Sequence, residues 1–286
     1  MQYRKVARQI KSHPTSDGDG VSISRVHGFD DPLSFSPFLL LDELKSDNPD
    51  DYIGGFPPHP HRGIETLTYM LCGHFEHKDH LGNRGALKSG GAQFMSAGRG
   101  VIHSEMPIIT EGKLHGFQMW INLPAAKKMQ TPWYEDFQSP QIAEYSEGEG
   151  NLLRLIAGQV SDGEAILRGP LMKTGVPVIV ADWQAKSGEE REIIFEPDFQ
   201  AKVFVYEGSV EIGNAIVEKG YLALLSEGEA LSIRSREATG VLILAGQVID
   251  EPVAHYGPFV MNTDQEIEQA LKDYRNGVLA RDDLGE

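Results

Sequence analysis

The feature that most constrains the fold of this chain is a succession of short apolar runs separated by turn residues. Residues 21–26 alternate apolar and polar side chains, and residues 65–71 place three large apolar side chains on one face. The 31 glycines and 16 prolines supply turns between such runs. Many short strands with turn signals between them predict an antiparallel barrel or sandwich. Further strand-like runs cover residues 37–42, 92–97, 117–123, 152–157, 176–181, 192–195, 202–206, 209–212, 221–225 and 241–244.

One short helix is predicted, close to the C-terminus. Thr263 and Glu266 have the spacing of a capping box, and Gly277 stands where a helix commonly ends. Between them, one apolar stripe consists of Ile267, Ala270, Leu271 and Tyr274. An apolar stripe needs a surface to cover it, so we expect this tail to pack back onto a barrel.

The length of 286 residues suggests two domains. Residues 69–76 resemble residues 205–211, and residues 91–98 resemble residues 220–228, which favours two similar β-domains in tandem. A stretch rich in proline and lysine interrupts the strand pattern between them. The predicted boundaries are an N-terminal domain at 1–125, a connector at 126–140, a C-terminal domain at 141–250 and a tail at 251–286.

The chain is acidic, with a formal net charge of -16 and a sequence pI near 5.0. An acidic surface repels phosphate groups, which argues against direct binding to nucleic acid or to an anionic membrane. No apolar run approaches the ~18 residues of a membrane span, and the N-terminus lacks the apolar segment of a signal peptide. Because Cys72 is the single cysteine, no intramolecular disulfide can form, and we expect a cytoplasmic protein.

Two pairs of side chains predict a metal site. His59 and His61 stand two residues apart, as do His103 and Glu105. Residues i and i+2 of a strand point to the same face, so two facing strands would bring three imidazoles and one carboxylate around one point. Such a donor set suits iron, manganese, nickel, copper, zinc or cobalt as a divalent ion. Four protein ligands would leave positions open for a substrate, which favours a catalytic site over a structural one.

Several neighbouring residues are weaker candidates. Glu65 lies on the strand that follows the first pair, and it competes with Glu105 as the carboxylate ligand. Phe56 and Arg62 flank the ligands and are expected at the mouth of the pocket, and Gln118 is expected inside it.

The polar stretch from 74 to 80 contains three more histidines. We expect His74, His77 and His80 to lie in a solvated hairpin loop, with a second metal site as the less favoured alternative.

The internal repeat predicts that the second domain lacks the ligands. Alignment of Gly73 with Gly208 places Ile194 and Glu196 where the first domain has His59 and His61. The corresponding alignment of Gly98 with Gly228 places Ile233 and Ser235 at the positions of His103 and Glu105. We therefore expect a C-terminal domain without a metal site.

Long stretches of the chain resemble the pirin branch of the cupin superfamily. The runs HPHRGIETLTYMLCG at 59–73 and SAGRGVIHSEMP at 96–107 carry the resemblance most strongly. Residues 42–43, 120–124 and 257–263 add to it, so that it covers nearly the whole chain. The resemblance implies an all-β bicupin fold, with two tandem antiparallel jelly-roll barrels and a short C-terminal helix.

The resemblance also implies a function. By motif, the metal ligands fall on His59, His61, His103 and Glu105, which selects Glu105 over Glu65, and the metal is expected to be Fe(II). Several pirins resemble quercetin 2,3-dioxygenases, which open a flavonol ring with O2, and in this activity Glu105 would also be catalytic. Other pirins are described as iron-dependent, redox-sensing regulators that act through protein partners. The chain is thus expected to be a metal-dependent dioxygenase or, alternatively, such a regulator.

Overall fold

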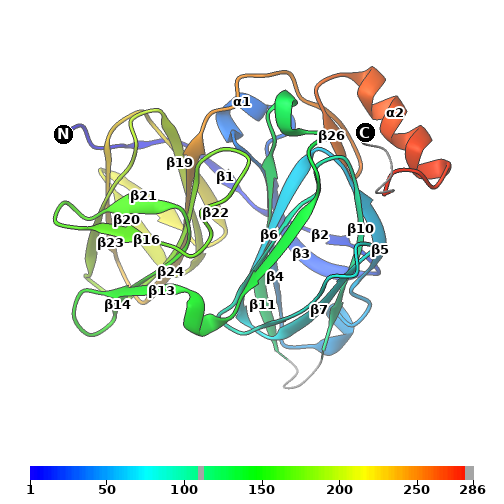
Figure 1. Ribbon diagram of the computed structural model, residues 1–286. Coiled ribbons are helices and arrows are strands. Elements are labelled where there is room, and N and C mark those ends of the chain that lie inside the picture. Colours follow the sequence, from blue (N-terminus) through cyan, green and yellow to red (C-terminus); the bar gives the residue numbers. More distant parts are fainter. Residues whose placement is uncertain (109–112, 281–286) are drawn as a thin grey trace. The chain divides into compact units, whose positions relative to one another are not determined.

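The computed structural model describes residues 1–108 and 113–280 (Figure 1). The chain forms two units, each built on antiparallel sheets, and we call them the N-terminal and C-terminal barrels. The N-terminal barrel comprises Pro14–Pro32, Phe38–Ser139 and Ile249–Glu286, and the C-terminal barrel comprises Met1–His13, Leu33–Pro37 and Pro140–Val248. Among the described residues, no helix is both long enough and apolar enough to cross a membrane.

The N-terminal barrel consists of a seven-stranded sheet in the order β12-β9-β6-β11-β4-β3-β2 and a four-stranded sheet in the order β5-β10-β7-β8. The strands of the first sheet are β2 (His13–Asp17), β3 (Val21–His27), β4 (Phe38–Ser46), β6 (Ile64–Cys72), β9 (Ala92–Ser96), β11 (Leu114–Asn122) and β12 (Trp133–Phe137). The strands of the second are β5 (Phe56–His61), β7 (His74–Asp79), β8 (Arg84–Lys88) and β10 (Val101–Pro107).

The C-terminal barrel consists of a seven-stranded sheet in the order β1-β22-β19-β24-β17-β14-β13 and a six-stranded sheet in the order β16-β15-β18-β23-β20-β21. The strands of the first sheet are β1 (Val6–Lys11), β13 (Ala143–Ser146), β14 (Asn151–Ala157), β17 (Val178–Ala185), β19 (Phe199–Glu207), β22 (Tyr221–Leu225) and β24 (Thr239–Gln247). The strands of the second are β15 (Gln159–Ser161), β16 (Ile166–Arg168), β18 (Glu190–Ile194), β20 (Ser209–Ile212), β21 (Ala215–Glu218) and β23 (Ala230–Ser235).

The order of strands confirms the tandem repeat and the all-β bicupin fold. The run β5-β10-β7-β8 of one barrel corresponds in order to β18-β23-β20-β21 of the other, and the seven-stranded sheets correspond strand for strand. The remaining elements are short. They are the sheet formed by β25 (Ala254–Tyr256) and β26 (Phe259–Met261), the helices α1 (Pro32–Phe35) and α2 (Asp264–Arg275), and the 3-10 turns η1 (Pro49–Asp51), η2 (Ala125–Lys127) and η3 (Ser139–Gln141).

The edges of the long sheets explain why the units do not follow the expected boundaries. β1 pairs with β22, which places the first residues of the chain in the C-terminal barrel. β12 lies within the expected connector 126–140, but it pairs with β9 at the edge of the N-terminal sheet. Without β1 and β12, the strands β22 and β9 would lie at the sheet edges and expose unpaired backbone groups. The two added strands pair with those groups.

The two barrels have different interiors although their sheets correspond. In the C-terminal barrel, one cluster of buried apolar side chains draws on both sheets, including Trp183, Val203, Ile233 and Ile243. In the N-terminal barrel, successive side chains of β11 point to opposite faces of the sheet. Phe117, Met119 and Ile121 are buried on one face. Gln118 and Trp120, on the other face, line a cavity.

The C-terminal helix forms as the sequence predicts. Thr263 Oγ1 accepts a hydrogen bond from the Glu266 backbone N–H, and the Glu266 carboxylate accepts one from the Thr263 backbone N–H. Ile267 and Ala270 of the predicted stripe are buried and pack with Phe259 of β26. The tail thus packs within the N-terminal barrel unit, where Figure 1 shows α2 beside β26.

We predict that Thr263→Ala lowers the free energy of unfolding of α2 by about 1 kcal/mol, because the first turn loses the acceptor of its capping box. Hydrogen exchange of the amides of α2 measures this change. Thr263→Ser keeps the hydroxyl and is expected to exchange like the wild type. Equal protection in the alanine and serine variants would contradict the role of the cap.

Candidate metal centre

The two predicted pairs lie on neighbouring strands. β5 and β10 are antiparallel partners, and His103 lies directly opposite His59. Beyond this point the register shifts, so that Glu105 lies opposite Phe56. The extra residue is on β5, where Pro57 and Pro58 offer no backbone N–H to the ladder. This bulge follows from the sequence, and it lies beside the histidines.

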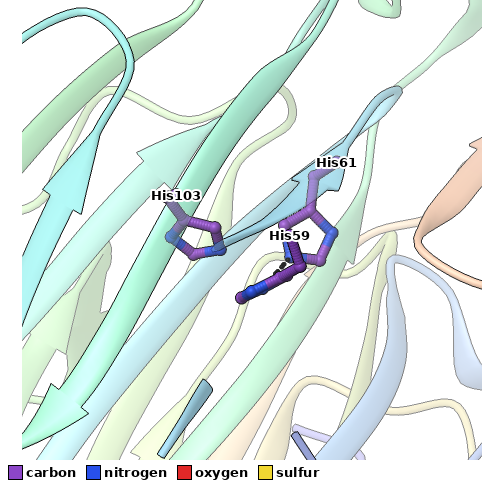
Figure 2. A group of neighbouring side chains, drawn as sticks. All are labelled: His59, His61 and His103. Carbon is purple, nitrogen blue, oxygen red and sulfur yellow. Dashed lines mark hydrogen bonds between the residues drawn. The ribbon is translucent and has the colours of Figure 1, made fainter. Parts of the chain in front are cut away.

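Three imidazoles meet between these strands (Figure 2). The ring centroids of His59 and His61 are 4.9 Å apart, those of His59 and His103 4.3 Å, and those of His61 and His103 5.1 Å. One nitrogen of each ring lies within 4.8 Å of the corresponding nitrogen of the other two. The structure therefore brings together the three predicted histidines.

Backbone carbonyl groups orient two of the rings. His59 Nδ1 contacts the Pro57 carbonyl oxygen at 2.9 Å, and His61 Nδ1 contacts the Pro258 carbonyl oxygen at 3.3 Å. A carbonyl oxygen can only accept, so each Nδ1 carries the ring proton and each Nε2 carries a lone pair. These two Nε2 atoms face each other at 3.1 Å, an arrangement that a shared cation stabilises.

The third ring is oriented by another histidine. His103 Nδ1 lies 3.4 Å from His77 Nδ1, while the buried His103 Nε2 has no hydrogen-bond partner among the described residues. A buried polar atom without a partner is costly, so this nitrogen has the character of a vacant ligand position. In all three rings Nδ1 thus contacts a neighbouring group.

Burial keeps the three rings neutral. It lowers the pKa of His59, and it lowers the pKa values of His61 and His103 well below the ordinary histidine value, with a smaller contribution from neighbouring imidazoles. Neutral imidazole is the form that binds metal ions. The donor set therefore fits a borderline divalent transition metal.

Glu105 joins the cluster through His103. Its carboxylate belongs with His103 and His77 to a second group of ligand atoms within 4.8 Å of one another, and it is not part of the first group. Thr68 Oγ1 donates to Glu105 Oε1 at 3.2 Å, and Gln118 Nε2 lies 3.5 Å from Glu105 Oε2. Burial raises the pKa of Glu105 to about 7, so this carboxyl group can take up or release a proton near neutral pH.

A cavity of about 870 Å³ adjoins the cluster. Two of the predicted pocket residues, Phe56 and Gln118, line it. The lining also includes the ligand candidates His59, His61 and Glu105, the rings of Phe29, Trp120 and His255, and the charged side chains of Asp17, Asp19, Arg25 and Asp42. The metal ligands thus lie at the surface of a space that is large enough for a polycyclic aromatic molecule.

The other two pocket candidates lie elsewhere. Glu65 is fully buried on β6 and belongs to neither group of ligand atoms. Arg62 does not line the cavity, because its side chain points to the tail. There its guanidinium pairs with Asp273 at 2.7 Å, and its Nε donates to the Arg99 carbonyl oxygen.

The tail therefore takes part in the site. The Val260 backbone N–H donates to the Arg62 carbonyl oxygen at 3.1 Å. The buried Lys128 Nζ donates to the carbonyl oxygens of Gly63 and Val260, each at 2.9 Å. It also donates to Asn122 Oδ1 at 2.8 Å. Gly63 has φ +80°, and a Cβ there would lie 2.0 Å from the Val260 oxygen, so the close approach of the tail requires this glycine. These contacts hold the segment that carries the Pro258 carbonyl.

The expectation for the polar stretch at 74–80 is wrong for His77. His74 and His77 lie on β7, and His77 is only 1% exposed and close to His103. His80 lies beyond the strand and is exposed. The signal in the sequence was the alternation of Phe75, His77 and Asp79, which places these three on the inner face of a strand.

The C-terminal barrel has apolar and non-ligating side chains at the corresponding place. Ile233 and Ser235 lie on β23, the counterpart of β10, and Ile233 belongs to the apolar core. Ile233 pairs with Arg191 on β18, as His103 pairs with His59 on β5. The alignment of Gly73 with Gly208 had instead placed Ile194 and Glu196 at the positions of His59 and His61. The alignment is displaced because the connections between the corresponding strands differ in length.

Two tandem antiparallel barrels, one of which carries a buried histidine cluster beside a cavity, define a bicupin protein. Residues 20–121 match the family model for pirin, and residues 180–280 match that for the pirin C-terminal cupin domain. The chain belongs to the pirin family.

Relatives match nearly the whole chain. A candidate quercetin 2,3-dioxygenase of Vibrio cholerae is 56% identical over 96% of this chain and 97% of its own length. Human pirin is 34% identical over 96% of this chain and 93% of its own. Among solved structures, a quercetin 2,3-dioxygenase from Acinetobacter baumannii matches with a TM-score of 0.88 and 33% identity, covering 97% of this chain and 99% of that one.

We predict that Asp273→Leu destabilises the tail by ~2 kcal/mol, because it leaves the nearly buried Arg62 guanidinium without its carboxylate. Urea unfolding and limited proteolysis of the tail measure the effect. The double variant Arg62→Met with Asp273→Leu removes both charges and is expected to be less destabilised. A double variant that loses more stability than Asp273→Leu alone would contradict the ion pair.

Glu105 predicts a pH dependence of the metal-free protein. Its folded pKa of about 7 lies above the ordinary value of 4.5, so between these values the folded state binds more protons than the unfolded state. The free energy of unfolding therefore decreases as pH rises from 4.5 to 7. Glu105→Gln does not titrate, and its stability is expected to decrease less across this window. Parallel curves from urea unfolding of the two proteins would contradict the raised pKa.

Proposed function

We propose that this chain is a metal-dependent dioxygenase that opens a flavonol ring with O2, in the manner of a quercetin 2,3-dioxygenase. The observation that carries the proposal is the convergence of three imidazoles, with one nitrogen of each within 4.8 Å of the others, beside a large cavity. In this proposal His59, His61 and His103 hold the metal together with Glu105, which adjoins them through His103. The similarity to proteins of Vibrio cholerae and Acinetobacter baumannii that are named as quercetin 2,3-dioxygenases supports the choice of substrate.

Iron(II) is the first metal to test. Three imidazoles and a carboxylate also accept manganese, cobalt, nickel, copper or zinc, and supply in the cell often decides between them. When bound, such an ion would supply positive charge for an ionised hydroxyl group, and a redox-active ion such as iron would also supply redox chemistry for O2.

The chain's own residues provide the proton acceptor. In the proposed reaction, Glu105 accepts the proton of the flavonol 3-hydroxyl at a carboxylate oxygen. In the metal-free protein, burial raises the pKa of Glu105 to about 7, so this carboxyl group can bind a proton inside the site. Thr68 and Gln118 hold the carboxylate in place from β6 and β11.

The cavity lining favours an uncharged aromatic substrate. Phe29 and His255 are stacked with ring centroids 3.8 Å apart, and the Trp120 ring lies edge-on to His61 at 5.2 Å. The described lining residues include four carboxyl groups and one guanidinium, that of Arg25, which already binds Asp42 and Asp17. An anionic substrate would meet repulsion there, whereas phenolic hydroxyl groups find acceptors.

We predict that His103→Ala and Glu105→Ala abolish the loss of quercetin absorbance by the metal-loaded protein. The first removes a ligand nitrogen, and the second removes the proton acceptor, which alone accounts for about 100-fold or more in rate. Ser104→Ala is the matched control, because Ser104 lies between them on β10 and does not line the cavity. Unchanged turnover in either of the first two variants would overturn the proposal.

A redox-sensing regulator that acts through protein partners is the alternative, supported by membership of the pirin family. Elemental analysis of purified protein, followed by oxygen uptake with quercetin, separates the two. Metal-loaded protein that consumes no oxygen, but captures a partner in one redox state only, would favour regulation. We place either activity in the reducing cytoplasm, because Cys72 has no second cysteine to pair with.

A further inference from the structure

The imidazole of His103 has a second buried neighbour on the side away from His59. β7 pairs with β10, with His77 opposite Glu105 and Asp79 opposite His103. This register brings His77 Nδ1 to 3.4 Å from His103 Nδ1, with ring centroids 5.1 Å apart. Both rings are buried, so water does not separate them.

A carboxylate lies on the far side of His77. Asp79 Oδ2 is 3.5 Å from His77 Nε2, and both side chains are only 1% exposed. The Asp79 carboxylate is itself fixed, because it accepts hydrogen bonds from the backbone N–H groups of Leu81 and Asn83 and from the Asn83 side chain. A fixed negative charge at this distance favours the tautomer of His77 that carries its proton on Nε2.

That tautomer leaves a lone pair on His77 Nδ1, which faces His103 Nδ1. His103 must then carry its proton on Nδ1, and its Nε2 is free for a metal ion. The order Asp79, His77, His103 thus forms a chain in which each group sets the proton position of the next. The chain ends at His103 Nε2, which has no hydrogen-bond partner among the described residues; His77 Nε2 has none either, and its link to Asp79 at 3.5 Å is electrostatic.

The ring of His77 is also held in place by packing. Tyr134 of β12 stacks on it, with centroids 4.5 Å apart and planes inclined by 21°. The Tyr134 hydroxyl in turn accepts a hydrogen bond from Gln93 Nε2 at 2.8 Å. The edge strand β12 therefore keeps His77 from rotating away from His103.

We propose that His77 is a positioning residue for the metal, which holds His103 in the ligating tautomer and, through Asp79, strengthens its donor nitrogen. The inference rests on the proposed metal site, and it adds a residue that contacts neither the metal nor the substrate. Hydrogen-bond partners of this kind commonly contribute 10–100-fold to the affinity of a metal site.

His77 also has a competing role, as a ligand of a second ion. His77, His103 and Glu105 form a buried group with ligand atoms within 4.8 Å. A second ion at this group would need His103 Nδ1 while the first ion holds Nε2, and His103 would have to lose both ring protons. A neutral imidazole gives up its last proton with difficulty, so the positioning role is favoured.

The test measures binding of Co(II), whose visible absorption reports the ligands, to three full-length proteins. His77→Phe keeps the stacking on Tyr134 but removes both nitrogens, and we expect 10–100-fold weaker binding with an altered spectrum. His77→Gln is the matched variant, because its amide oxygen can accept from His103 while its amide nitrogen faces Asp79. It is expected to restore most of the affinity and the wild-type spectrum. Thermal unfolding without metal verifies that each variant is folded.

The outcomes separate this inference from the function on which it rests. Wild-type affinity and spectrum in His77→Phe would overturn the positioning role and leave the metal site intact. Equal losses in the phenylalanine and glutamine variants, or a second bound Co(II) that disappears with His77, would also overturn it. A wild type that binds no Co(II) would overturn both the inference and the proposed site. Because no flavonol is present, the dioxygenase proposal is tested separately.

Discussion

The site depends on the position of three ring protons. Each imidazole of the cluster can present Nε2 to a metal only if Nδ1 holds its proton, and in the proposed tautomers each Nδ1 has an acceptor. The acceptors are a carbonyl of the bulge on β5, a carbonyl of the tail and a ring nitrogen on β7. Three features keep these acceptors in position. They are the bulge at Pro57 and Pro58 on β5, the contacts that Arg62 and Lys128 make with Val260 of the tail, and the strand order around β10.

The two barrels use one strand order for different purposes. In the C-terminal barrel, the positions around β23 contribute to a continuous apolar core, and burial of apolar surface is the main source of its stability. The N-terminal barrel has a histidine cluster and a cavity at the corresponding place. Contacts such as the Arg62–Asp273 pair and the buried Lys128 add polar cross-links to this barrel.

Local patterns in the sequence predicted the strands, the helix and the three histidines, because alternation with period two and capping spacing involve neighbours along the chain. Contacts between distant residues could not be read in this way. The carbonyl that orients His61 lies 197 residues away, and the partner of Arg62 lies 211 residues away. His77 was missed because the polar residues of β7 suggested a loop, although their alternation was that of a strand.

The tail has a consequence for how the protein matures. Ribosomes deliver the N-terminal strands first, so β5 and β10 are made long before Pro258 leaves the exit tunnel. Until then His61 lacks the acceptor that fixes its ring, and the cavity lacks the wall formed by His255 and Pro258. A nascent or prematurely terminated chain therefore carries all three histidines of the cluster, but it lacks the carbonyl that orients His61 and one wall of the cavity.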